Sequence, residues 1–160
     1  MATMLLQDGV HAVTPDDFPR MVEVWEESVR ATHHFLAEAD IQKLKPLVAD
    51  VFHPPMQLAA VRDEAGQVAG FLGVADRKLE MLFIHPTFRG GGAGRRLVRH
   101  AVDVLGATTV DVNEQNEQAV GFYLRMGFEV ERRSELDGQG NPFPLLHMRL
   151  SAEPSDNRSD

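Results

Sequence analysis

The strongest constraint on the fold of this chain is a run of glycines that separates two kinds of apolar pattern. Residues 89–96 read RGGGAGRR; the apolar run LEMLFI lies just upstream, and apolar residues at helical spacing follow. Glycine allows backbone amides to approach a ligand, and a helix N-terminus favours an anion. The run therefore predicts a strand, an anion-binding loop and a helix in that order. Its spacing fits neither a Walker loop nor a dinucleotide-binding fingerprint.

Two interpretations of the glycine run stay open on the residues alone. A flexible strand-to-helix turn would use the same glycines. The flanking arginines favour a bound anion instead, because positive charge at a helix N-terminus opposes the helix dipole and an anion relieves that repulsion.

The spacing of apolar residues predicts the remaining elements. Thr14 and Pro15, followed by two acids, are typical of a helix start, and a second helix is expected over 40–52. From residue 57 onward, short apolar runs predict three strands. After the glycine run we expect a helix, a strand, a helix ended by Gly127 and a closing hairpin. With a strand at the N-terminus, this order indicates an α+β or mixed α/β sheet without regular βαβ alternation.

Composition and charge exclude several classes of function. The chain has 160 residues, and we expect one domain over residues 1–150 with a polar tail over 151–160. It contains no cysteine, which excludes disulfides, thiol nucleophiles and cysteine-based metal sites and fits a cytoplasmic location. The formal charge of −8 disfavours nucleic acid and anionic membranes as partners, and no apolar run is long enough to span a bilayer. No metal is expected, because the histidines lack ligand spacing.

Two motifs, in order along the chain, resemble those of the GNAT superfamily of acetyl-CoA-dependent N-acetyltransferases. Arg89-x-x-Gly92-x-Gly94 is similar to motif A of the family. The segment NEQAVGFYLRMGF, from Asn116 to Phe128, is similar to motif B and lies at the expected distance downstream. Each motif alone is weak evidence, whereas the pair in order is specific.

The opening of the chain extends this resemblance. Trp25-x-x-Ser28 and the pattern THHFL at 32–36 are similar to those of a small bacterial subgroup of the family, so that the resemblance covers about residues 15–150. It implies the GNAT fold, which is a central mixed, mostly antiparallel, seven-stranded twisted sheet flanked by about four helices.

The resemblance also implies acetyl-CoA as the cosubstrate and no metal. Backbone amides of the glycine loop would bind the pyrophosphate, and the strand before the loop would hold the pantetheine arm, with the amide near Leu82 polarising the acetyl carbonyl. The positions that carry these expectations are Leu82, Phe83 and Ile84 on the strand and Arg89, Gly90, Gly91, Gly92, Ala93, Gly94 and Arg95 in the loop.

Two residues of the second motif carry further expectations. Asn116 resembles the asparagine that binds the pantetheine arm or positions the helix, and the alternative from the residue alone is a helix N-cap. Tyr123 resembles the tyrosine that binds the donor and protonates the departing thiolate, since a phenol is protonated at neutral pH. The alternative for Tyr123 is a core aromatic beside Phe122.

The family has no fixed residue that deprotonates the amine. We expect Glu80 as the general base, because alternation along the strand would place its side chain on the side of Leu82 and Ile84. An exposed edge-strand charge is the alternative. Contacts to the acceptor are expected from the first helix and the segment after it: Trp25, Ser28, His33 and His34. Either histidine could also serve as the base, and the alternative for the pair is a solvated helix end.

Acidic residues on the first two helices suggest attraction of a cationic amine. With a negative charge overall, the carboxylates would draw a cation toward the site by long-range attraction. Solvated helix faces that only keep the protein soluble are the alternative. The carboxylates concerned are Glu26, Glu27, Glu38 and Asp40.

These features together predict an N-acetyltransferase that passes the acetyl group of acetyl-CoA directly to a primary amine in a ternary complex. A small-molecule amine is the first expectation for the acceptor. A protein lysine or N-terminus is one alternative, and a non-catalytic acyl-CoA-binding module is another. The enzyme would act as a monomer or a homodimer.

Overall fold

The computed structural model describes residues 6–34 and 36–151, and the chain divides between Ala107 and Thr108 into two compact units. Phe35 of the pattern at 32–36, the first five residues and nearly all of the expected tail lie outside the described residues. The expectation of a single domain over residues 1–150 therefore stays a prediction.

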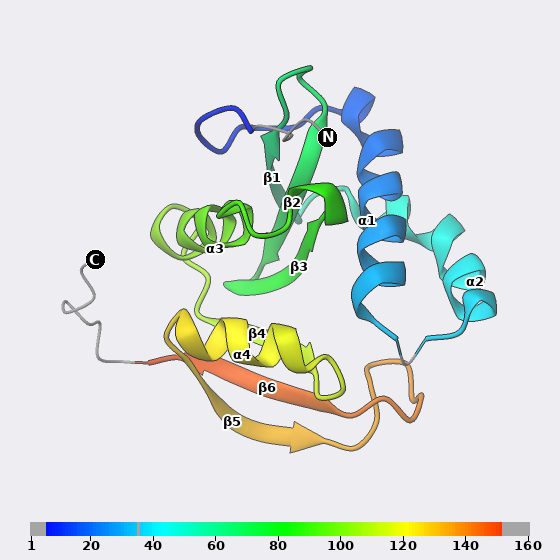
Figure 1. The fold of residues 1–160 in the computed structure, drawn as a ribbon. Helices are drawn as coiled ribbons and strands as arrows, with labels where there is room; N and C mark the ends of the chain where they lie inside the picture. The colour runs from blue at the N-terminus through cyan, green and yellow to red at the C-terminus, as the bar shows by residue number, and fades with distance from the viewer. Residues whose placement is uncertain (1–5, 35, 152–160) are drawn as a thin grey trace. The chain divides into compact units, whose positions relative to one another are not determined.

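The first unit has a sheet with helices on both faces (Figure 1). Its strands pair antiparallel in chain order: β1 (Gln57–Arg62), β2 (Val68–Ala75) and β3 (Lys78–Ile84). Its longer helices are α1 (Phe18–Thr32), α2 (Glu38–Val48) and α3 (Ala93–Asp103). Short 3-10 helices precede α1, follow α2 and follow β3: η1 (Pro15–Asp17), η2 (Ala49–Val51) and η3 (Pro86–Phe88).

Strand β2 shows how the two faces differ. The ring of Phe71 lies 5.5 Å from that of Phe52 and 5.7 Å from that of Phe83, on the side covered by α1 and α2. Its neighbour Gly70 faces the other way, where an added Cβ would lie 3.4 Å from the side chain of Leu97 on α3. Alternation along the strand thus gives one face to α1 and α2 and the other to α3.

Burial of apolar side chains holds α1 and α2 on their face. The core there contains Met21 and Val24 of α1, which are fully buried, with Ile41 of α2 and Phe52 at 2 % exposed. Each such side chain contributes about 1.5–3 kcal/mol when removed from water. The helical spacing of apolar residues along α1 is therefore what fixes its contact face.

The second unit is a smaller sheet with one helix. Its strands pair antiparallel in the order β4 (Thr109–Asn113), β6 (Leu145–Leu150) and β5 (Phe128–Ser134). α4 (Glu117–Arg125) packs on one face, where the ring of Tyr123 lies 5.7 Å from that of Phe128. Val110 and Met148 pair across β4 and β6 and are both buried, so they belong to the same face.

The expected element order is confirmed, with one difference in strand number. Six strands are found in the described residues instead of seven. Within residues 6–14, only Leu6 and His11 form isolated bridges, to Asp63 and Ala60. Between them Gly9 has a φ of +87°, which turns the chain out of extended geometry and prevents a continuous ladder.

The N-terminal segment is nevertheless fixed to the first unit. The N–H of Gln7 donates to the carbonyl of Arg62 at 2.7 Å, and His11 and Ala60 exchange two backbone hydrogen bonds of 2.8 Å. The guanidinium of Arg96 donates to the carbonyl of Gln7 at 3.0 Å. The segment thus lies along β1 without forming a strand.

The described residues contain neither a membrane-spanning helix nor a metal-binding cluster. No helix there has the length and hydropathy that crossing a membrane requires. Nor do those residues include a group of three or more histidine, cysteine or acidic side chains placed to hold a metal ion.

Candidate functional site

The glycine loop connects η3 to α3 with a backbone that requires glycine at two positions. Gly90 has a φ of +83° and Gly92 a φ of +85°, a region that side-chain-bearing residues rarely adopt. A Cβ added at either position would meet no atom within 4 Å. Conformation, and not crowding by the protein, therefore demands glycine here, and the space beside the backbone is open to a ligand.

The start of α3 presents unpaired backbone donors beside this loop. Gly92 is the N-cap and supplies no capping side chain. The earliest helical hydrogen bond runs from the N–H of Arg96 to the carbonyl of Gly92, at 3.1 Å. The N–H groups of Ala93, Gly94 and Arg95 come before it and have no intrahelical acceptor. The predicted strand, loop and helix are confirmed, with the helix N-terminus at the glycines.

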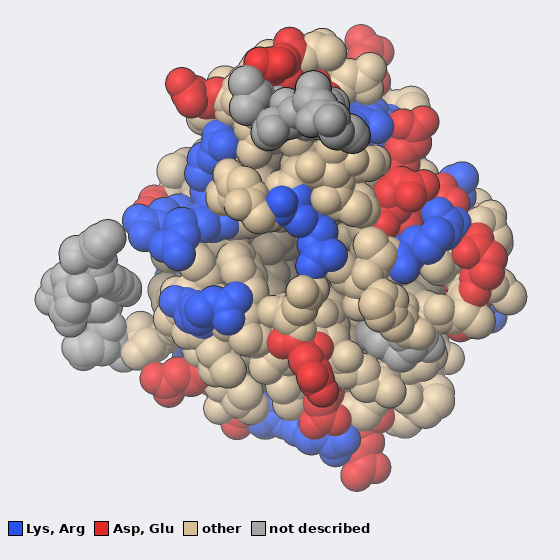
Figure 2. Space-filling view, in the orientation of Figure 1, with Lys and Arg blue, Asp and Glu red and all other residues tan. Residues whose placement is uncertain are grey.

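Positive charge surrounds this helix N-terminus. Basic side chains gather over α3 in Figure 2, and the sequence there contributes Arg95, Arg96 and Arg99. Cations in the first turn oppose the helix dipole, so the arrangement favours an anion at the amides. Binding of a phosphate group by this loop stays a prediction.

The strand that leads to the loop is held on one edge by β2. Leu82 pairs with Leu72, Phe83 with Phe71 and Ile84 with Gly70. These three residues of β3 are half-buried. Their backbone is thereby fixed in extended form, as binding of a pantetheine arm requires.

Glu80 occupies a β-bulge in β3. Leu79 pairs with Val74 and Met81 pairs with the adjacent Gly73, so that Glu80 has no partner on β2. Simple alternation, on which the predicted orientation of its side chain depended, does not hold across a bulge. The residue is exposed, and it makes no hydrogen bond or ion pair within the described part of the chain. Its role as general base stays a prediction.

Of the residues expected to contact the acceptor, two lie in the core. Trp25 is 7 % exposed and packs among the apolar residues of α1 and α2, and Ser28 is 6 % exposed. Little of either side chain remains for a substrate. His34 is exposed, and its Nε2 donates to the carbonyl of Ala31 at 2.7 Å.

His33 is the C-cap of α1, and its hydrogen bond fixes the tautomer of its ring. The hydroxyl of Thr32 donates to the carbonyl of Ser28 at 2.7 Å, so its oxygen accepts the 2.9 Å hydrogen bond from Nδ1–H of His33. Burial, followed by the charge of the neighbouring His34, lowers the pKa of His33 to about 4. His33 is therefore neutral at pH 7 and a weak proton acceptor. The i, i+4 spacing of Ser28 and Thr32 is the sequence signal for this contact.

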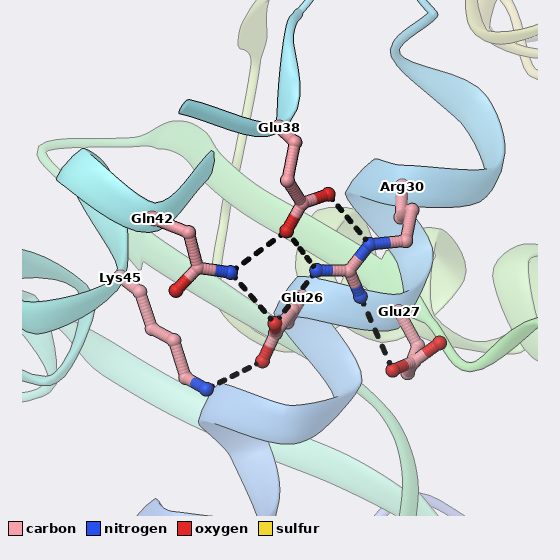
Figure 3. A network of polar contacts seen from close by, with 6 residues as sticks. All are labelled: Glu26, Glu27, Arg30, Glu38, Gln42 and Lys45. Atoms are coloured by element: carbon pink, nitrogen blue, oxygen red, sulfur yellow. Dashed lines mark hydrogen bonds and ion pairs between the residues drawn. The ribbon is translucent and has the colours of Figure 1, made fainter. Parts of the chain in front are cut away.

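The carboxylates expected to attract a cation are already paired (Figure 3). Arg30 lies 2.8 Å from Glu26, 3.3 Å from Glu27 and 2.9 Å from Glu38. Lys45 of α2 lies 2.7 Å from Glu26, and hydrogen bonds from Lys45 and then Arg30 lower the pKa of Glu26 to about 2. These contacts join α1 to α2.

Asp40 is engaged as well. Its Oδ2 accepts a 2.9 Å hydrogen bond from the N–H of Ala37 at the start of α2. Arg30 and Lys45 thus offset two of the four negative charges and a net negative charge remains, so the attraction of a cationic amine by these carboxylates stays a prediction.

In the second unit, Asn116 caps α4. Its Oδ1 accepts a 3.2 Å hydrogen bond from the N–H of Ala119, so the N-cap alternative is confirmed. The side chain is only 9 % exposed. Its Nδ2 makes no hydrogen bond within the described residues. Every fully buried side-chain nitrogen or oxygen in those residues has a hydrogen-bond partner, so this Nδ2 is not fully buried. The amide nitrogen therefore keeps accessible surface at which it can donate.

Tyr123 combines a buried ring with a reachable hydroxyl. The residue is 6 % exposed, and its ring packs edge-on against Phe122 and Phe128, so the core-aromatic alternative describes the ring. The hydroxyl makes no hydrogen bond within the described part of the chain. All fully buried side-chain nitrogens and oxygens there have hydrogen-bond partners, so this hydroxyl is not fully buried. Its oxygen therefore retains accessible surface. Burial raises the pKa of Tyr123, which keeps the phenol protonated.

Comparison with known proteins gives three findings. Residues 23–152 match a family described as "Acetyltransferase (GNAT) domain". A Salmonella typhimurium protein named "Peptidyl-lysine N-acetyltransferase YjaB" is 43 % identical over 129 residues, which cover 81 % of this chain and 88 % of that protein. The solution structure of apo-form YjaB from Escherichia coli superimposes with a TM-score of 0.79 at 39 % identity, over 88 % of this chain and 95 % of the other.

A more distant likeness concerns the fold alone. The PaiA N-acetyltransferase of Thermoplasma acidophilum, solved in complex with coenzyme A, has a TM-score of 0.69 at 19 % identity, over 89 % of this chain and 98 % of that one.

Proposed function

This chain belongs to the GNAT family of N-acetyltransferases, and from that membership we propose that it transfers the acetyl group of acetyl-CoA to the side-chain amine of lysine residues in proteins. The observation that carries the choice of acceptor is the 43 % identity to a relative named as a peptidyl-lysine N-acetyltransferase. The first sequence-based expectation, a small-molecule amine, has no such support, and its alternative is the better founded.

The glycine loop supports acetyl-CoA as donor. A pyrophosphate needs several N–H donors converging on one place, and the amides of Ala93, Gly94 and Arg95 at the start of α3 are such donors. The open space beside Gly90 and Gly92 allows close approach. The positions that would hold the pyrophosphate are Arg89, Gly90, Gly91, Gly92, Ala93, Gly94 and Arg95, and the pantetheine arm would lie along Leu82, Phe83 and Ile84.

The donor supplies the acetyl group as a thioester, and we assign a proton and a positioning contact to Tyr123 and Asn116. Tyr123 is protonated at neutral pH because burial raises its pKa, and its accessible hydroxyl can donate that proton to a departing thiolate. Asn116 uses its Oδ1 for the helix cap and keeps its Nδ2 for the pantetheine arm. The N-cap and the ligand contact are compatible, because they use different atoms of one side chain.

A lysine ammonium must lose a proton before it attacks. Glu80 remains our candidate for the group that receives it, since an exposed carboxylate can pass a proton to solvent. His33 is the weaker candidate, because it is partly buried and its Nδ1–H is already donated to the hydroxyl of Thr32.

An acceptor competition tests this proposal. The protein is incubated with acetyl-CoA and a lysine-containing peptide with a blocked N-terminus, with the same peptide carrying arginine, or with a polyamine. Released thiol measures turnover, and mass spectrometry locates the acetyl group. We expect thiol release and acetylated lysine with the first peptide only. Turnover confined to the polyamine would restore the small-molecule acceptor, and no turnover with any amine would favour a non-catalytic acyl-CoA-binding module.

A further inference from the structure

A chain of hydrogen bonds joins a serine, a histidine and an aspartate across the sheet of the second unit. The Oγ of Ser134 on β5 lies 2.7 Å from Nε2 of His147 on β6. The Nδ1 of His147 lies 2.7 Å from Oδ1 of Asp111 on β4. The three residues come from three different strands. Asp111 and His147 are 36 positions apart in the sequence, and Ser134 and His147 are 13 apart.

The register of the sheet explains why the three side chains meet. Asp111 and His147 are direct cross-strand partners, and Ser134 pairs with Leu145, two residues before His147 on β6. Side chains two residues apart on a strand share a face. This face is opposite the one covered by α4, because the neighbouring pair of Val110 and Met148 is buried beneath that helix.

The donor and the acceptor of each of these two hydrogen bonds can be assigned. A carboxylate only accepts, so Nδ1 of His147 carries the proton that is donated to Asp111. In the neutral imidazole Nε2 then has a lone pair, and the hydroxyl of Ser134 donates its proton to it. This is the orientation in which a histidine can remove a serine proton while a carboxylate fixes the tautomer.

The side chains of His147 and Asp111 are largely buried, whereas Ser134 lies next to exposed residues. The side chain of His147 is 16 % exposed and that of Asp111 is 24 % exposed. Ser134 is half-buried at the end of β5, and the next residues, Glu135 and Leu136, are exposed. An acyl group could therefore approach the hydroxyl from the loop that follows β5.

From this geometry we infer that Ser134 is a nucleophile that accepts an acyl group from activated acyl esters and thioesters, with His147 as its base and Asp111 as the residue that positions His147. The Oγ of Ser134 forms a bond to the acyl carbon, and the bond from that carbon to the leaving oxygen or sulfur breaks. The hydroxyl proton passes to Nε2 of His147 and then to the leaving group. The product is an acyl ester on Ser134 and a free alcohol or thiol.

This site does not depend on the proposed lysine acetylation. It lies within the second unit and uses none of the residues assigned to that function. The other explanation for the contacts is a polar network that only ties three strands together. The two explanations differ in whether the serine reacts.

The experiment uses p-nitrophenyl acetate as the acyl donor and the full chain as the acceptor. Release of p-nitrophenolate follows the reaction, and peptide mass spectrometry identifies the acetylated residue. We expect an acetyl group on Ser134, none at that position in Ser134→Ala, and acylation slower by about 10²-fold or more in His147→Gln, because general-base assistance is worth that much. Asp111→Asn should slow acylation as well, since an amide does not fix the tautomer in the same way.

Controls separate loss of reaction from loss of fold. Ser151→Ala removes a hydroxyl of the same unit and should acylate Ser134 at the parent rate. Thermal melting by circular dichroism reports on folding of each variant, whether or not lysine acetylation is observed. Absence of acetyl on Ser134 in the folded parent overturns the proposal. So does an unchanged rate in folded His147→Gln, because the serine would then react without the histidine.

Discussion

The Oδ1 of Asn116 accepts a hydrogen bond from the N–H of Ala119 in the first turn of α4, while the Nδ2 of the same side chain makes no hydrogen bond within the described residues. One amide group thus offers two separable functions. The oxygen satisfies a backbone donor at the helix start, and the nitrogen is available to a ligand.

Substitution at Asn116 should separate these functions. Asn116→Ala removes the cap and should lower the free energy of unfolding by about 1 kcal/mol, whereas Asn116→Ser keeps a capping oxygen and most of the stability. Both variants lack the amide nitrogen and should bind acetyl-CoA more weakly, as measured by isothermal titration calorimetry. Parent-like affinity in Asn116→Ser would show that the residue is a cap and nothing more.

The glycine loop can be tested by thermal shift. Acetyl-CoA at a hundredfold excess over its dissociation constant should stabilise the parent by about 2.7 kcal/mol, because only the folded state binds it. Gly94→Glu should abolish the rise in melting temperature, since a carboxylate beside the unpaired amides of α3 repels a phosphate. Gly138→Glu adds the same charge at an exposed glycine with no atom within 4 Å of the new Cβ, and should keep the shift. An equal shift in Gly94→Glu would place the donor elsewhere.

The Tyr123 hydroxyl should matter to turnover but not to folding. Tyr123→Phe keeps the ring that packs against Phe122 and Phe128, so its melting temperature should stay near that of the parent. Loss of the proton donor should reduce kcat by roughly 10²-fold or more, while the thermal shift with acetyl-CoA persists. If steady-state kinetics give the parent kcat, the residue acts only as a core aromatic.

His33 should make stability depend on pH. Its pKa is about 4 in the folded chain and 6.5 as the ordinary value, so between these values the unfolded state binds more protons than the folded state. Stability therefore rises with pH across this window and is lost as pH falls from 6.5 toward 4. Between pH 7 and pH 5 we expect the parent to lose about 2 kcal/mol more than His33→Asn in urea unfolding. Identical pH profiles for the two proteins would contradict this.

Features encoded by adjacent residues were predictable from the sequence. Gly90 and Gly92 lie between a strand and a helix, and that context alone indicated the loop and the helix N-terminus. Asn116 precedes a helical stretch by one residue, which made the N-cap a stated alternative. In both cases the physical cause lies within one turn of chain.

Features that depend on pairing between distant segments were not predictable. The bulge at Glu80 exists because Leu79 and Met81 pair with adjacent residues of β2, and no local pattern reveals that offset. The charge on Glu26 is taken up by Lys45 of another helix. Asp111, Ser134 and His147 meet only through the register of three strands, so the histidine gave no signal by itself.

The N-terminal segment covers part of the outer edge of β1. Its few backbone hydrogen bonds, from Gln7 and His11, occupy groups on an edge that would otherwise be open to another chain. Exposed strand edges are templates for intermolecular pairing. A variant trimmed to begin at residue 13 should therefore aggregate through β1, and static light scattering should show a rising particle mass with concentration. A tag or fusion partner is better attached at the other end of the chain.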